Sequence, residues 1–133
     1  MNNLKNYAPA VGWGIFIFII STISGKDIPT IPDLWDLIKI DKLVHMTVYG
    51  ILTWLILRGW SKSNPTATKA EFLITGIKTA LICALFGLFL EWYQENYCED
   101  RLFEVLDEVA NAIGAFFAAT VYYFYKSRLK KNV

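Results

Sequence analysis

Residues that could do chemistry gather in two stretches of this sequence, and the first begins at Asp41. Asp41, His45 and Tyr49 recur every four residues, so on a helix they lie on one face. An imidazole beside a carboxylate supports general acid–base catalysis near neutral pH. Two alternatives stay open for His45: a neutral imidazole that only hydrogen-bonds to Asp41 or to a carbonyl, and a metal ligand.

The second stretch, residues 91–114, carries carboxylates and amides at helical spacing. Glu91 and Gln94 share one helix face, and Asp107, Asn111 and Gly114 share another. Asp107 and Asn111 could serve binding or catalysis, or they could only join two helices, at about 0.6 kcal/mol per hydrogen bond. Metal ligation is not favoured, because one histidine with three carboxylates is a small ligand set and the sequence lacks an HExxH spacing. No metal or other cofactor is therefore expected.

Two basic residues, Lys42 and Arg101, lie next to these polar stretches. Arg101 could form an ion pair with Glu91, or it could join Lys42 in neutralising a phosphate group. We expect Arg101 to contact Glu91 or Asp107, because a guanidinium beside a carboxylate gains from a bidentate pair.

The composition indicates what kind of fold must carry these residues. Of the 133 residues, 55% are hydrophobic and 16% are aromatic, which is too apolar for an ordinary soluble domain. The 13 basic residues are balanced by 12 acidic ones, whereas a nucleic-acid-binding protein would carry a basic excess. We therefore predict an integral membrane protein with a single domain over residues 1–133, surrounded by the lipid bilayer and without a nucleic-acid partner.

Apolar segments predict four membrane-crossing helices, at about residues 8–24, 41–60, 70–97 and 103–125. The predicted fold class is all-α, a four-helix bundle. Pro29 and Pro32 interrupt the chain after the first helix, and a short interfacial helix is predicted at 34–40. A cleaved signal peptide is the alternative for the first helix, because Lys5 precedes its apolar core and small residues follow near Ser24.

Lysine and arginine are distributed unevenly along the chain, and this predicts its orientation. Nine lie in the N-terminus, the 58–78 region and the C-terminal tail, against four in the two intervening regions. By the positive-inside rule both termini are cytoplasmic, and the polar stretches lie at the outer ends of their helices. Charged groups at membrane depth are costly and are functional candidates by default. We therefore expect a polar pocket open to the outside and lined by His45, Glu91, Gln94, Asp107 and Asn111.

Small residues predict where two helices pack closely. Ala110, Gly114 and Ala118 recur every four residues, a pattern that lets neighbouring backbones approach in membrane bundles. A larger side chain at Gly114 should push the last helix away from its neighbour.

In this order, the polar residues resemble the pattern of the VanZ-like family of bacterial membrane proteins. An Asp-Lys-x-x-His-x-x-x-Tyr segment opens one helix, Glu-x-x-Gln closes the next, and an arginine then precedes Asp-x-x-x-Asn-x-x-Gly. The resemblance covers roughly residues 35–120 and departs at 98–101, where Cys-Glu-Asp-Arg replaces a Gly- or Pro-containing run. The matching positions are Asp41, Lys42, His45, Tyr49, Glu91, Gln94, Arg101, Asp107, Asn111 and Gly114.

The resemblance implies a bacterial plasma membrane protein with a link to resistance against the glycopeptide teicoplanin, but it implies no particular molecular activity. One function class is a cell-envelope protein whose pocket binds a lipid headgroup, a cell-wall precursor or a partner protein. The other is a membrane enzyme acting on a lipid-linked or phosphate-bearing headgroup, with His45 oriented by Asp41 and a second carboxylate from Glu91 or Asp107. A transporter is a weaker third class, because four helices without internal repeats would need to form a homo-oligomer.

Overall fold

The computed structural model describes residues 4–22, 34–98 and 103–129, and the secondary structure within these ranges is helical. The helices are α1 (Leu4–Ser21), α2 (Leu34–Ser63), α3 (Lys69–Tyr97) and α4 (Val105–Leu129). Each of the four is long and apolar enough to cross a membrane. The prediction of an all-α fold with four membrane-capable helices is confirmed, and it fits a multi-pass membrane protein.

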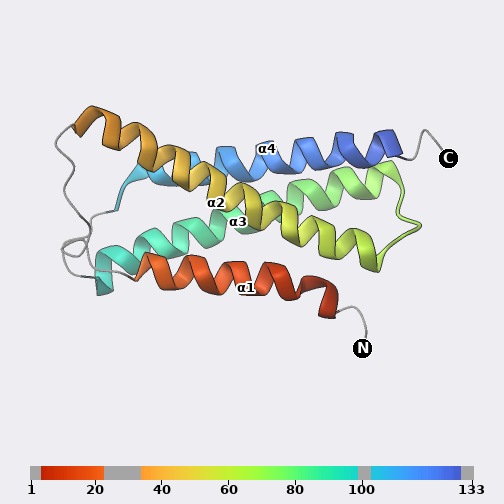
Figure 1. The fold of residues 1–133 in the computed structure, drawn as a ribbon, viewed down its shortest axis with the longest axis horizontal. Coiled ribbons are helices and arrows are strands. Elements are labelled where there is room, and N and C mark those ends of the chain that lie inside the picture. Colours follow the sequence, from red (N-terminus) through yellow and green to blue (C-terminus); the bar gives the residue numbers. More distant parts are fainter. Residues whose placement is uncertain (1–3, 23–33, 99–102, 130–133) are drawn as a thin grey trace.

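The four helices run alternately up and down, as Figure 1 shows. The start of α1, the end of α4 and the connection between α2 and α3 lie at one end of the bundle. That connection closes with a capping box, in which the Thr68 hydroxyl accepts from the Glu71 amide and the Glu71 carboxylate accepts from the Thr68 amide. The opposite end, called the polar end below, holds the end of α1, the start of α2, the end of α3 and the start of α4.

Several helix boundaries differ from the predicted ones, and the largest difference is at the start of α2. The structure shows no separate interfacial helix at 34–40, because α2 is one helix from Leu34 to Ser63. The physical reason is that no proline or glycine occurs between Pro32 and Gly50, so nothing in the backbone stops the helix at 41. The first helix begins at Leu4, four residues before the predicted start, and continues through Pro9.

The surface of the bundle is apolar where a membrane would surround it. Large apolar side chains remain highly exposed on α3 and α4, among them Ile82 at 62%, Leu85 at 63% and Phe117 at 69%. A soluble monomer rarely exposes a large continuous apolar surface. The exposed apolar side chains therefore fit contact with membrane lipid.

Helices α2 and α4 touch through their backbones, and this contact fixes the geometry of the polar end. A Cβ atom placed on Gly114 would overlap the carbonyl oxygen of Met46 and lie 2.7 Å from its carbonyl carbon. On the facing helix, a Cβ atom placed on Gly50 would lie 3.3 Å from the Gly114 carbonyl oxygen. His45 precedes Met46 directly, and Asn111 lies one turn before Gly114, so the contact brings these two side chains together.

Helix α1 is joined to the bundle by both polar and apolar contacts. The Trp13 indole donates a hydrogen bond to the Val48 carbonyl at 2.9 Å. Ile17 is only 2% exposed and belongs to the apolar core. Helix α1 can therefore contribute a wall to any cavity beside α2 and α3.

Candidate functional site

Lys42 lies at the centre of an ion-pair network at the polar end. Its ammonium nitrogen lies 3.0 Å from Asp41 Oδ2 and 2.8 Å from Glu104 Oε2, and it also contacts Asp107 Oδ1. Asp41 and Lys42 come from α2, Asp107 comes from the first turn of α4, and Glu104 directly precedes α4. Because three carboxylates already surround this ammonium group, little of its charge is left to neutralise a phosphate.

His45 lies between α2 and α4 and is held by an amide. Its Nδ1 is 2.9 Å from Asn111 Oδ1, and Asn111 is only 1% exposed. The Asn111 Nδ2 group faces Glu108 Oε2 at 3.5 Å, so the amide oxygen is the atom turned toward the imidazole. An amide oxygen only accepts, and therefore Nδ1 carries the hydrogen.

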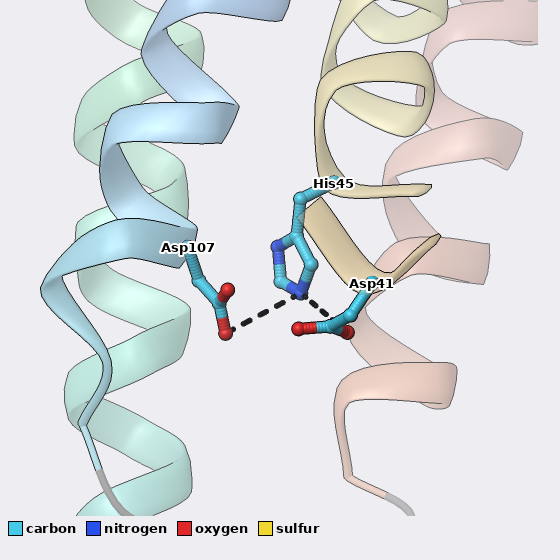
Figure 2. A group of neighbouring side chains, drawn as sticks. All are labelled: Asp41, His45 and Asp107. Atoms are coloured by element: carbon cyan, nitrogen blue, oxygen red, sulfur yellow. Dashed lines mark ion pairs between the residues drawn. The ribbon is translucent and has the colours of Figure 1, made fainter. Parts of the chain in front are cut away.

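The other imidazole nitrogen of His45 is turned toward two aspartates, one on each helix. Nε2 lies 3.8 Å from Asp41 Oδ1 and 3.7 Å from Asp107 Oδ2. Figure 2 shows the imidazole between the two carboxylates, with Nε2 pointing at both. Both distances exceed hydrogen-bonding range. Asp41, one of the hydrogen-bond partners considered for His45, is thus out of range, and the bond is made to Asn111 instead.

A cavity of about 160 Å³ opens between α1, α2 and α3 at the polar end. Its polar lining comes from residues singled out in the sequence, together with one residue of α1: Ser21, Asp41, His45, Tyr49, Glu91 and Gln94. Its apolar lining consists of Ile17, Ile20, Val44, Val48 and Leu90. Asp107 and Asn111, which the sequence placed in the same pocket, do not line this cavity but contact His45 from the α4 side.

Glu91 and Gln94 line this cavity from α3, and each also connects α3 to another segment. Glu91 is 4% exposed, and its Oε2 accepts from the backbone amide of Glu104 at 3.5 Å, just before α4 begins. Gln94 is 8% exposed, and its side-chain nitrogen donates to the Ser21 carbonyl at the end of α1 at 2.9 Å. The two side chains thus position the segments on either side of the cavity.

Two of the singled-out residues have other surroundings. Tyr49 is 4% exposed, lines the cavity and packs against Phe86, with ring centroids 6.4 Å apart. Arg101 lies outside the described residues, so its contact with Glu91 or Asp107 stays a prediction.

The sequence interpretation missed Glu104, which precedes α4, Glu108 in α4, and the whole contribution of α1. Glu104 and Glu108 have a detectable signal, because they lie three residues before Asp107 and three before Asn111 and so share their helix faces. Ile17 and Ser21 carry no such signal, since an apolar residue and a serine in a membrane helix usually only pack.

The charges at this site are strongly unbalanced. Among the described residues, the connected network holds the carboxylates of Asp41, Glu91, Glu104, Asp107 and Glu108. Lys42 is its one ammonium group, and His45 its one imidazole. An arrangement of this kind attracts a cation, or the positively charged part of a larger ligand, rather than an anion.

Comparison with known proteins agrees with the order of the polar motifs. The sequence profile of the VanZ/LLP1 family matches residues 3–126, which is nearly the whole chain. No curated protein and no solved structure matches the chain. The resemblance noted from the motifs is confirmed, and it extends over α1 as well.

Proposed function

The chain belongs to the VanZ/LLP1 family, and we propose that it is a cell-envelope membrane protein that binds a polar headgroup in its cavity. The headgroup belongs to a lipid or to a lipid-linked cell-wall precursor, and the part that enters the cavity carries an amine. The observation that carries this proposal is the lining, which includes two carboxylates and, among the residues that the structure describes, no lysine or arginine.

The lining matches an ammonium group in charge and in shape. Asp41 and Glu91 supply negative charge from α2 and α3, and Ser21 belongs to the α1 wall. The ring of Tyr49 adds an aromatic surface, to which ammonium groups are attracted. Lys42 does not line the cavity, because its ammonium group lies among the carboxylates on the α4 side.

The size of the cavity favours a fragment over a whole ligand. About 160 Å³ is well below the roughly 300–1,000 Å³ of pockets that enclose drug-sized molecules. A small amine-bearing headgroup fits such a space, whereas a whole disaccharide does not. The apolar residues of the lining, including Ile17 and Leu90, would contact the carbon atoms of the ligand.

Native mass spectrometry tests the proposal with the purified full chain in detergent. We expect the protein to retain phosphatidylethanolamine in preference to phosphatidylglycerol, and Glu91→Gln to reduce this preference at least tenfold. Glu95→Gln is the matched control, because Glu95 is an exposed carboxylate one turn further along α3 and does not line the cavity. Equal retention of the two lipids, or equal losses in both variants, would exclude an amine-selective cavity.

A membrane-embedded enzyme is the second candidate, and the orientation of His45 favours it. Asn111 holds Nδ1, which leaves Nε2 as the atom able to accept or deliver a proton at the cavity. His45→Gln separates the two candidates when membrane abundance stays normal. Binding alone predicts a graded loss of activity in cells, whereas acid–base catalysis predicts a loss of about 10²–10⁴-fold.

We further propose that both termini are cytoplasmic in a bacterial plasma membrane, which would place the cavity at the outer surface. The support is the excess of lysine and arginine at the end of the bundle opposite the cavity. An outer cavity is accessible to envelope lipids and cell-wall precursors. This position is compatible with a role in glycopeptide susceptibility, which we propose as the cellular readout.

A further inference from the structure

Three atoms with free lone pairs face one another beside the cavity: His45 Nε2, Asp41 Oδ1 and Asp107 Oδ2. They all lie within 4.8 Å of one another. Since Nδ1 donates to Asn111, Nε2 of the neutral ring carries a lone pair. Among the described residues, no hydrogen bond reaches either of the two oxygens, and Asp107 is only 8% exposed. Three electron-rich atoms at this spacing would attract a positive charge between them.

We propose that Asp41, His45 and Asp107 bind one divalent transition-metal ion through these three atoms (Figure 2). Nε2 lies 3.7 Å from the Asp107 oxygen and 3.8 Å from the Asp41 oxygen, and the two oxygens are no more than 4.8 Å apart. The point equidistant from the three atoms therefore lies about 2.4 Å from each, or closer. Zn²⁺ bonds to nitrogen and carboxylate oxygen are about 2.0–2.2 Å long, so shifts of a few tenths of an ångström complete the site. The imidazole favours Zn²⁺ or another first-row ion over Mg²⁺ and Ca²⁺.

The residues around the three ligands match the usual surroundings of a metal-bound histidine. Such a histidine commonly donates its other ring N–H to an oxygen that fixes the ring, and here Asn111 is the acceptor. Glu108 in turn orients the Asn111 amide. Lys42 binds Asp41 Oδ2 and Asp107 Oδ1, the outer oxygens, and leaves the inner oxygen of each aspartate directed at Nε2. These contacts orient all three ligands before an ion arrives.

Among the described residues, two other sources of positive charge fit the geometry less well. A protonated imidazole would place its Nε2–H group 3.7–3.8 Å from both oxygens, beyond hydrogen-bonding range, and would leave both oxygens unpaired. Lys42 lies on the outer oxygens, so it compensates part of the charge without filling the space between the three ligands. The site holds more carboxylates than Lys42 can neutralise, and a divalent ion corrects this imbalance.

Three protein ligands leave at least one coordination position for water or for another ligand. Asp41 and His45 also line the cavity, so the open position is adjacent to it. Metal binding does not depend on the proposed headgroup, because it can be measured with the metal alone and without lipid. A failure of either proposal therefore leaves the other standing.

The experiment measures the metal content of the purified full chain in detergent after chelation and reloading with Zn²⁺ or Mn²⁺. We expect about one ion per chain by elemental mass spectrometry. Asp107→Asn should abolish binding, and Asn111→Ala should weaken it by about 10–100-fold, as changes beside metal-bound histidines do. Glu95→Gln, which removes an exposed carboxylate outside the cluster, should bind like the parent.

A second readout keeps the test valid if Asp107→Asn folds poorly. Co²⁺ loaded into the parent protein should give a visible spectrum that His45→Gln changes, and thermal unfolding shows whether each variant is folded. Absence of bound metal in the parent, or equal binding by Asp107→Asn and Glu95→Gln, would overturn the proposal. So would a parent that binds no ion while Lys42→Met binds one, because Lys42 would then be the resident cation.

Discussion

Replacing Gly114 with alanine should destabilise the bundle through the contact between α2 and α4. The added methyl group overlaps the Met46 carbonyl oxygen, and its approach to the Met46 carbonyl carbon must open from 2.7 Å to the 3.4 Å of ordinary contact. Both partners are backbone atoms, so no side-chain rotation can relieve the overlap, and the helices must separate. Overpacking of this kind costs about 1–3 kcal/mol, while alanine regains roughly 0.5–1 kcal/mol of helix propensity. We expect a net loss of about 1 kcal/mol at the midpoints of these ranges, and of about 2.5 kcal/mol at most.

Alanine variants of three other glycines extend this prediction to a graded series, which thermal unfolding in detergent would measure. A Cβ atom on Gly12 meets nothing within 4 Å, one on Gly76 comes within 3.7 Å of the Ala119 Cβ atom, and one on Gly50 within 3.3 Å of the Gly114 carbonyl oxygen. The melting temperature should therefore fall in the order Gly12→Ala, Gly76→Ala, Gly50→Ala, Gly114→Ala. Gly12→Ala should equal or exceed the parent, because only the helix propensity changes.

This reasoning would be refuted if the Gly114→Ala protein had the same melting temperature as the Gly12→Ala protein. Helices α2 and α4 would then not touch through their backbones. The same variant should also lose the hydrogen bond between His45 and Asn111, because both residues lie within one turn of the contact. Loss of stability without any loss of headgroup or metal binding would separate packing from the site.

Gly87→Ala should weaken metal and headgroup binding with little change in melting temperature, because its Cβ atom would lie 2.8 Å from Asn111 Nδ2 and displace that amide. Unchanged binding in both assays would show that the Asn111 amide need not stay fixed. Glu91→Gln and Asp107→Asn should abolish activity in a glycopeptide-susceptibility assay at normal membrane abundance, because each removes one carboxylate from the network. If both variants behave like the parent, the network is only structural. In a cysteine-free chain, an impermeant maleimide should label Thr30→Cys but not Lys130→Cys in whole cells. Labelling of Lys130→Cys, or failure to label Thr30→Cys, would contradict the orientation.

The sequence was sufficient to predict the bundle because its strongest signals are long apolar segments. Their length led to four membrane-capable helices, and the i, i+4 spacing placed Asp41 and His45 on one face. Helix ends were predicted less well, because the segment 34–40 was interpreted as a separate interfacial helix. Helix α2 instead continues through them from Leu34.

The site was predicted only in part, because spacing along one helix does not reveal how neighbouring helices are rotated. The sequence placed Asp107 and Asn111 in the same pocket as Glu91, but the rotation of α4 turns them toward His45. Metal ligation was not favoured from the sequence, because the ligand set was small and no HExxH spacing occurs along the chain. The three proposed ligands come from two helices, and only the close contact at Gly114 brings them together.

The most direct measurement is an experimental structure of the protein in nanodiscs that contain phosphatidylethanolamine. Headgroup binding predicts ligand density in the cavity between α1, α2 and α3, with a nitrogen-bearing group within about 4 Å of a carboxylate oxygen of Glu91 or Asp41. The same map of Glu91→Gln should show weaker density. A cavity that is closed by side chains in the parent, or that holds only water in both proteins, would contradict the proposed function.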